Sequence, residues 1–145
     1  MELGIGMFGD LQYNQQTQKY QSPAEKLTEL VEQIKLADEI GIDVFSIGEH
    51  HRSDYAVSSP EIILSALSTV TKNITLGSGV TFLSSTDPVK VYQNFATLDL
   101  LSNQRAEIMA GRGSFIESFP LFGYDLQDYN SLFEAKLELL IHLNQ

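Results

Sequence analysis

The stretch Val44-Phe45-Ser46-Ile47-Gly48-Glu49-His50-His51 determines which fold the sequence predicts. Its first four residues form a short, mostly apolar run that predicts a strand, and an acid and two imidazoles follow where that strand ends. A polar loop and a new helical pattern come next. This order is typical of a βα barrel, in which the chemistry lies at the C-terminal ends of the strands.

The chain contains three further units in which a strand is followed by a helix. Strands are predicted at residues 3–8, 44–47, 74–83 and 106–110. Helices are predicted from 23 to a stop at Gly41, from 60, from 88 to about 102 and from about 131. The pairs Ser22-Pro23, Ser59-Pro60 and Asp87-Pro88 each place a capping residue before proline, which is how many helices begin. The polar residues 9–21 predict a loop.

Alternating strands and helices with short connections predict parallel strands joined by right-handed crossovers. Such units occur in an open doubly wound sheet and in a barrel. The first βα loop contains no G-x-G-x-x-G, which argues against the dinucleotide-binding open sheet. Long polar segments follow strands one, two and four, as barrel active-site loops do. We therefore expect an α/β fold of about four of the eight parallel βα units of a TIM barrel, truncated after the fourth helix.

The 145 residues show no linker and no change of composition, so we expect residues 1–145 to form one domain, with no second domain. A complete barrel typically needs ~250 residues. The last helical pattern is still periodic at Gln145, and we expect a truncated, proteolysed or naturally split polypeptide. Half a barrel exposes the edges of its first and fourth strands and one apolar sheet face. We therefore expect a homo-oligomer or a complementary C-terminal half as partner.

The composition excludes several classes of partner. Nine basic against 19 acidic residues give a formal charge of −10, which argues against nucleic acid and anionic membrane surfaces. No apolar run approaches the ~20 residues of a membrane span. The absence of cysteine excludes disulfides, thiolate metal sites and a cysteine nucleophile. No secretory signal is present at the start, so we expect a cytoplasmic protein.

His50 and His51 are the first candidates for chemistry. Neighbouring side chains near a strand end point in different directions, so we expect one imidazole to face the barrel axis and the other to pack outward. An inward imidazole can donate or accept a proton near neutral pH. The alternative is a loop histidine that is hydrogen-bonded for structural reasons. A metal site with Glu49 lacks a third ligand at supportive spacing, so no metal is predicted.

Arg112 lies between Gly111 and Gly113, directly after the fourth strand. Glycine there lets a flat or anionic ligand approach the backbone, and a guanidinium can bind a phosphate through two hydrogen bonds. A turn with a solvated arginine is the alternative. Gly77-Ser78-Gly79-Val80 predicts a bulge, a tight packing point or a strained segment beside a ligand.

Two further groups of residues favour structural roles. An ion pair between Asp99 and Arg105 is expected to fix the third helix to the fourth strand. The aromatic cluster Phe115, Phe119, Phe122 and Tyr124 is expected either to line a pocket or to join the core.

Six short segments follow one another along the chain in a characteristic order. They are 45–51 (FSIGEHH), 74–80 (ITLGSGV), 86–88 (TDP), 96–102 with Arg105 (ATLDLLS), 111–114 (GRGS) and 122–125 (FGYD). In order and spacing they resemble the bacterial luciferase-like family of flavin-dependent monooxygenases, which are βα barrels. The resemblance covers nearly all 145 residues and implies the N-terminal half of a luciferase-like (β/α)8 barrel.

The resemblance implies an enzyme that uses reduced FMN and dioxygen to oxygenate a small organic substrate, with the flavin reduced by a separate flavin reductase. His50 would lie over the flavin and assist proton transfer, with Glu49 beside it. Gly79-Val80 would form a non-proline cis peptide packed against the ring. Gly111-Arg112 would reach the flavin phosphate.

Two alternatives remain open. One is a deazaflavin-dependent oxidoreductase on the same fold, and the other is a non-catalytic half barrel that serves as a structural or partner-binding subunit. Gln104 occupies a position that is commonly glycine in the family, and we expect Asn103 to adopt the left-handed conformation instead. Barrel phosphate sites usually draw on the loops after strands seven and eight. We therefore expect the isolated chain to bind flavin weakly or not at all.

Overall fold

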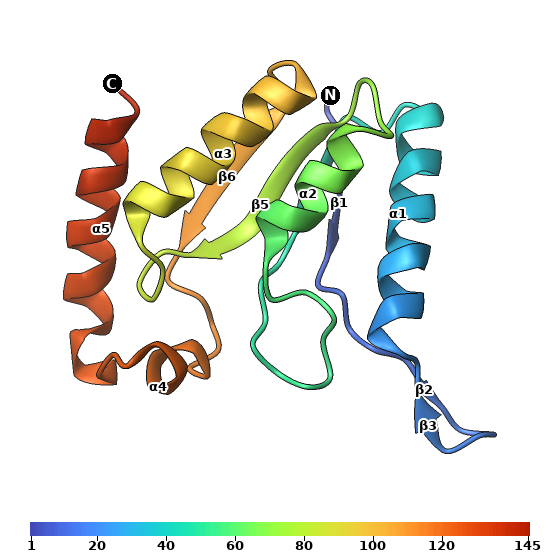
Figure 1. Cartoon of the computed structure of the whole chain (residues 1–145), viewed down its shortest axis with the longest axis horizontal. Coiled ribbons are helices and arrows are strands. Elements are labelled where there is room, and N and C mark those ends of the chain that lie inside the picture. The colour runs from blue at the N-terminus through green and yellow to red at the C-terminus, as the bar shows by residue number, and fades with distance from the viewer.

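The computed structural model describes all residues 1–145 and shows a four-stranded parallel sheet with helices packed on one face (Figure 1). The strands lie in chain order: β1 (Gly4–Met7), β4 (Val44–Ile47), β5 (Thr75–Phe82) and β6 (Ala106–Gly111). The helices are α1 (Pro23–Glu39), α2 (Pro60–Ser68), α3 (Pro88–Ser102), α4 (Ser118–Phe122) and α5 (Tyr129–Leu143), with a 3-10 turn η1 (Leu126–Asp128). The predicted α/β class and the four parallel βα units are confirmed.

Capping side chains start the helices largely as the sequence predicts. The Ser22 hydroxyl accepts the N–H of Glu25 at 3.2 Å, and the Glu25 carboxylate accepts the N–H of Ser22 at 3.0 Å. This reciprocal pair satisfies two N–H groups that the first turn of α1 leaves free. Asp87 caps α3 by accepting the N–H of Lys90 at 2.9 Å. Ser59 makes no capping bond, so α2 relies on proline in its first turn.

One continuous apolar core lies between the sheet and helices α1, α2, α3 and α5. Every second strand residue points into it, because side chains alternate between the two faces of a strand. Its fully enclosed members include Leu30, Ile34, Phe45, Ile47, Leu64, Leu67, Ile74, Leu76, Val91 and Leu98. Burial of such side chains contributes ~1.5–3 kcal/mol each. None of the helices combines the length and the apolar character that a membrane span requires.

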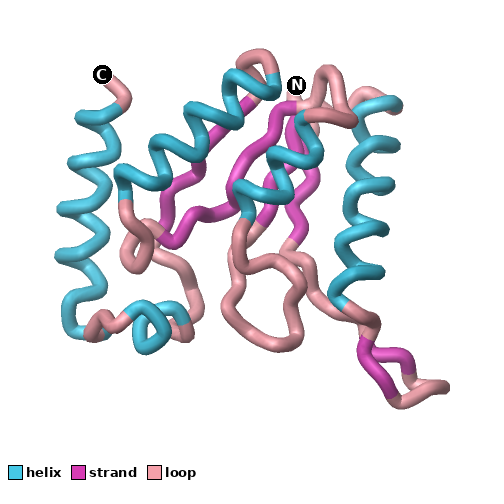
Figure 2. The backbone as a smooth tube through the Cα atoms, in the orientation of Figure 1, coloured by secondary structure: helices cyan, strands magenta, loops and turns pink.

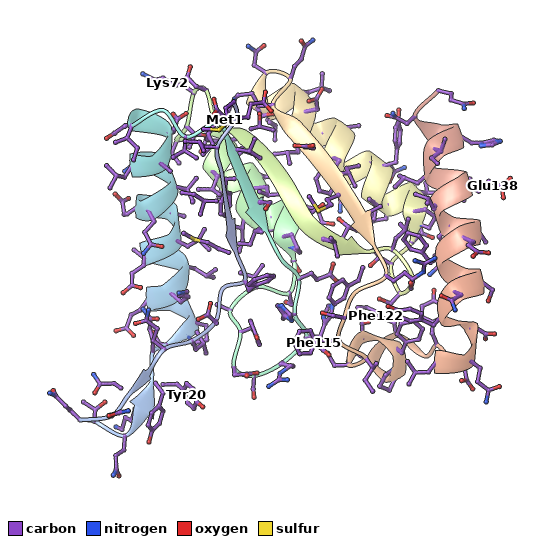
Figure 3. The ribbon with its side chains drawn as sticks, turned by 180° about the vertical axis from the view of Figure 1, so that it is seen from behind. Met1, Tyr20, Lys72, Phe115, Phe122 and Glu138 are labelled. Carbon is purple, nitrogen blue, oxygen red and sulfur yellow. The ribbon has the colours of Figure 1, made fainter.

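The other face of the sheet carries no helix, as the view from behind shows (Figure 3). The strand residues on this face include Gly4, Gly6, Val44, Ser46, Thr75, Gly77, Gly79, Glu107 and Met109. The prediction of an apolar face is therefore wrong, because only Val44 and Met109 contribute large apolar groups. The inner face of a small barrel has room only for limited side-chain volume, which accounts for the small residues. β1 and β6 form the two open edges, as expected.

A buried carboxylate holds the turn between α2 and β5. The side chain of Asp38 accepts the backbone N–H groups of Lys72, Asn73 and Ile74 at 2.7, 2.8 and 2.7 Å. Burial raises the pKa of Asp38, but these three donors and the positive charge of Arg105 outweigh it and hold the pKa below its usual value. The charged carboxylate therefore fixes where β5 begins.

Arg105 holds the same turn from the opposite side. Its guanidinium donates to the carbonyls of Ile74 at 2.6 Å and Thr71 at 3.2 Å. The predicted ion pair between Arg105 and Asp99 is wrong, because Asp99 instead accepts the N–H of Ala106 at 3.2 Å. Asp99 thus connects α3 to β6 through a backbone N–H, whereas Arg105 connects the residue before β6 to the turn between α2 and β5.

Left-handed residues end two helices as predicted. Gly41 (φ 85°) follows α1, and Asn103 (φ 59°) is the C-cap of α3. Gln104 also has a positive φ of 65°, so Asn103 shares the left-handed conformation with Gln104 and does not replace it, contrary to the expectation. At each of these turns the chain reverses direction, and the next strand begins within three residues of the turn.

Segments predicted as loops contain short elements that the sequence did not reveal. Residues 9–21 include a hairpin of β2 (Tyr13–Asn14) and β3 (Lys19–Tyr20) that projects from the body (Figure 2). The Asn14 side chain accepts the N–H groups of Gln16 and Thr17 and so stabilises its turn. Strands of two residues are too short to produce a periodic pattern. The same holds for the single turns α4 and η1 after β6.

Candidate functional site

The C-terminal ends of the strands open into one cleft of about 780 Å³. This volume lies within the range of small-molecule and cofactor sites. Phe8 follows β1, Glu49 and His50 follow β4, Gly79 and Val80 lie in β5, and Gly111 and Arg112 lie at the end of β6; all of them line the cleft. The residues predicted as site residues therefore meet at one cavity. An apolar hollow of about 750 Å³ between α3 and α5 contains none of them.

His50 lies inside a cage of aromatic rings. It stacks on Tyr55 with ring centroids 4.0 Å apart, and it meets Phe115 and Phe8 edge-on at 4.9 and 5.6 Å. Its Nδ1 faces Glu117 Oε1 at 3.7 Å, beyond hydrogen-bond length. Burial lowers the pKa of His50 and the Glu117 carboxylate raises it, with the net result below the usual value. The imidazole is therefore mainly neutral at pH 7 and able to accept a proton.

His51 lines a separate polar pocket behind the cleft, so the two imidazoles diverge as the strand geometry predicts. Its Nε2 is 2.7 Å from Glu49 Oε1, and its ring packs against Phe122. The other oxygen of Glu49 accepts the N–H of Phe82 at 3.4 Å. Burial raises the pKa of Glu49, and the bond to His51 opposes that effect. No group of three or more His, Asp or Glu side chains is placed to hold a metal ion.

Glycines shape the floor of the cleft. The peptide bond between Gly79 and Val80 is cis, as predicted. A Cβ on Gly79 would lie 2.9 Å from Ser46 Oγ, and a Cβ on Gly111 would lie 2.6 Å from Val80 Cγ2. Neither position accepts a side chain without displacing its neighbour. The missing side chains at these two glycines therefore let Ser46 and Val80 pack closely against the backbone beside the cleft.

Arg112 lies exposed at the rim of the cleft. Its guanidinium lies over the face of Phe133 with 4.5 Å between the guanidinium carbon and the ring centroid. It forms no ion pair within the chain. The adjacent Gly113 (φ 77°) lets the chain turn, and the Tyr129 hydroxyl donates to its carbonyl. The guanidinium is thus available for an anionic group such as a phosphate.

Two residues at the site were missed by sequence reasoning. Tyr55 stacks on His50 from the same polar loop, and an aromatic residue five positions after the imidazole was its only signal. Glu117 reaches His50 from beyond β6, and no local pattern connects the two. Of the aromatic cluster, Phe115 (labelled in Figure 3) lines the cleft. Phe119 is buried, so both of the expected roles occur.

Comparison with known proteins places this arrangement in a family. The family model described as luciferase-like monooxygenase matches residues 1–143. The N-acetyl-S-alkylcysteine monooxygenase of Bacillus subtilis (strain 168) is 31% identical over 125 residues, which cover 84% of this chain and 37% of that protein.

Two solved structures share the fold. The oxygenating constituent of 3,6-diketocamphane monooxygenase from Pseudomonas putida, in complex with FMN, has a TM-score of 0.84 at 20% identity over 97% of this chain and 38% of that chain. At that identity it shows the fold alone. The coenzyme F420-dependent tetrahydromethanopterin reductase of Methanopyrus kandleri has a TM-score of 0.64 at 26% identity over 86% of this chain and 30% of that chain.

The chain spans from 26% to 37% of the length of the first curated relatives that it matches. Its four parallel strands and the cleft at their C-terminal ends correspond to the first units of a barrel. Because the family model covers residues 1–143, the chain belongs to the luciferase-like monooxygenase family.

Proposed function

We propose that residues 1–145 act as a single domain, the N-terminal half of a flavin-dependent monooxygenase that oxygenates a small organic substrate with reduced FMN and dioxygen. A separate flavin reductase would supply the reduced flavin. The observation that carries the proposal is that His50, the cis peptide Gly79–Val80 and Arg112 border the same cleft. Reduced flavin, when bound, supplies the electrons for the reaction with dioxygen. The side chains of this chain would bind and orient the flavin, exclude water from the cleft and transfer a proton.

The floor of the cleft fits a planar ring system. Gly79, Val80 and Gly111 present backbone and one small apolar side chain, with no room for a bulkier group. Phe8 and Phe115 lie beside His50 and limit the access of water. Water exclusion strengthens polar contacts inside the cleft and protects labile intermediates. We infer that a flavin ring rests on this floor.

Arg112 supports the proposal that the phosphate group of the flavin lies at the rim of the cleft. Its guanidinium is exposed at the rim, has no carboxylate partner and is oriented by the ring of Phe133. Five N–H donors in a planar fork match the oxygens of a phosphate. In the proposed complex Arg112 contacts the phosphate, and Gly111 lets the ligand approach the backbone.

His50 is the proposed proton-transfer residue. Its lowered pKa keeps the imidazole neutral at pH 7, so it can accept a proton in the cleft and return it later. Glu49 lies beside it, held by His51 and the N–H of Phe82, and shapes the wall of the cleft.

Substitution of His50 by alanine tests this role in a complete barrel that contains the present residues. We expect substrate oxygenation to fall ~10²–10⁴-fold, the usual contribution of a positioned acid–base group, while flavin affinity is largely retained. His142→Ala is the matched control, because His142 is exposed in the last turn of α5 and does not line the cleft. Unchanged turnover in His50→Ala would remove this residue from the mechanism.

A deazaflavin-dependent reaction is the second candidate, favoured by the likeness to the F420-dependent reductase. Parallel titrations of the complete barrel with FMN and with F420 separate the two. Tighter binding of FMN and oxygen consumption support the monooxygenase. Tighter binding of F420 without oxygen consumption supports the alternative, and binding of neither supports a non-catalytic subunit.

The isolated chain should bind FMN weakly or not at all, because a barrel phosphate site draws on loops that four units do not supply. It should also self-associate through the open edges of β1 and β6, or require a complementary half. Flavin fluorescence titration and light scattering measure both. Tight stoichiometric binding by a monomer would contradict this expectation.

A further inference from the structure

Two buried polar atoms at the cleft have no hydrogen-bond partner. They are Nδ1 of His50 and Oε1 of Glu117, and they lie 3.7 Å from each other. The His50 side chain is 5% exposed and that of Glu117 is 19% exposed. Buried polar groups are nearly always hydrogen-bonded, so an unpaired donor and an unpaired acceptor that face each other at this distance are complementary.

The aromatic cage leaves the imidazole little freedom to turn elsewhere. Tyr55 stacks on its face at 4.0 Å with an interplanar angle of 24°, and the ring of Phe115 lies perpendicular to it at 4.9 Å. The guanidinium of Arg52 lies over the rings of both Tyr55 and Phe115. The orientation that directs Nδ1 toward Glu117 is therefore held by packing.

The second ring nitrogen, Nε2, has no protein partner and is not among the enclosed polar atoms. It is therefore the nitrogen of His50 that a molecule in the cleft can reach. Which nitrogen carries the proton decides whether the neutral ring offers an acceptor or a donor to that molecule.

We propose that Glu117 is the positioning residue of His50. Its carboxylate accepts a hydrogen bond from Nδ1–H when the 3.7 Å gap closes by a small movement, and it thereby holds the proton of the neutral imidazole on Nδ1. The lone pair of Nε2 then faces the cleft as a proton acceptor. The catalytic meaning of this tautomer rests on the proposed function, but the tautomer itself does not.

The charges around His50 are consistent with this arrangement. Glu117 and Asp54 favour the protonated imidazole, whereas burial and Arg52 disfavour it. Tyr55 faces the ring as a stacked neighbour. Because Arg52 and Asp54 pair with each other at 2.8 Å, Glu117 is the carboxylate whose charge acts on His50 without an ion-pair partner of opposite charge.

Nitrogen-15 NMR of the histidine rings tests the proposal in the 145-residue chain without flavin. The chain has only three histidines, at 50, 51 and 142, so assignment by substitution is direct. Protonated and unprotonated ring nitrogens have well-separated shifts, which report the tautomer. We expect neutral His50 as Nδ1–H and neutral His51 as Nε2–H, the latter donating to Glu49.

Two variants separate positioning from mere structure. In Glu117→Gln the amide oxygen still accepts from Nδ1, so the tautomer persists while the pKa of His50 falls further. In Glu117→Ala the acceptor is lost and we expect His50 to change to Nε2–H. Glu134→Gln, an exposed change on α5, should leave both properties unaltered.

The His51 signal reports folding in every variant, because its partner Glu49 is untouched. If Glu117→Ala loses the His51 signal, that variant has not folded. The pKa of His50 in Glu117→Gln is then the measurement that tests the proposal. A native His50 in the Nε2–H form would overturn the proposal, as would a pKa of His50 that Glu117→Gln leaves in place. Since no flavin is present, loss of the proposed flavin activity leaves this result intact, and the two failures are distinguishable.

Discussion

Asp38→Ala should strongly destabilise the fold, because one side chain satisfies three consecutive backbone N–H groups. The N–H of Ile74 belongs to a buried residue, so its loss of a partner should cost ~1–3 kcal/mol. Lys72 and Asn73 are exposed, and water can replace part of each bond, at ~0.5–1 kcal/mol each. The sum predicts a loss of about 3 kcal/mol in the free energy of unfolding.

Urea unfolding followed by circular dichroism measures this loss, provided that the slope against denaturant stays the same. Asp43→Ala is the matched control, because Asp43 accepts a single N–H, that of Leu3, at an exposed position. It should cost less than about 1 kcal/mol. A loss in Asp38→Ala that equals the control would refute the reasoning that this carboxylate sets the start of β5.

The lowered pKa of Asp38 adds a pH signature to the same variant. A carboxyl whose folded pKa lies below its unfolded value stabilises the fold above the unfolded value, ~3.9, and loses this contribution as the pH falls through the folded value. The difference in the free energy of unfolding between the native chain and Asp38→Ala should therefore become smaller below about pH 4. A gap independent of pH would show that the charge makes no contribution.

Three further predictions concern the cleft and its supports. Gly111→Ala should lower the free energy of unfolding, measured in urea, by ~1–3 kcal/mol, because the new Cβ would lie 2.6 Å from a side-chain carbon of Val80. Gly6→Ala is the control and should cost less, because its Cβ would lie 3.6 Å from the hydroxyl of Ser46. Equal losses in the two variants would contradict this reasoning. Arg105→Lys should cost ~2 kcal/mol by the same assay, since lysine cannot reach all the backbone carbonyls that the guanidinium contacts, while the surface change Arg52→Lys should have little effect. Because the folded pKa of His50 is lowered, stability should fall as the pH drops below ~6.5, and His50→Gln should flatten that fall in pH-dependent melting; an unchanged slope would refute it.

The main elements of the fold could be predicted because their signals are local. Caps such as Ser22 and Asp87 lie next to the helices that they begin, and the alternation of strand and helix admits few topologies. The Asp99–Arg105 ion pair was wrong for the opposite reason. The two residues are close in sequence, but the carbonyl of Ile74 that Arg105 contacts becomes available only after β5 and β6 pair.

The candidate site divides in the same way. His50, Gly79 and Arg112 each follow or lie in a strand, and parallel strands bring these positions to one end of the sheet, so their convergence could be expected. Glu117 lies 67 positions after His50 in the chain, in a segment whose path depends on the short helix α4. Such a contact depends on tertiary structure alone.

The agreement between strand order and chain order has a consequence for synthesis. β1, β4, β5 and β6 leave the ribosome in the sequence in which they stand side by side, so each finds its pairing edge already formed. At ~5–20 residues per second, a nascent chain of this length has several seconds to build its helix-covered core. We expect stalled nascent chains to gain protection from protease stepwise, one βα unit at a time. The glycine-rich inner face meanwhile offers little apolar surface to chaperones or to other unfinished chains.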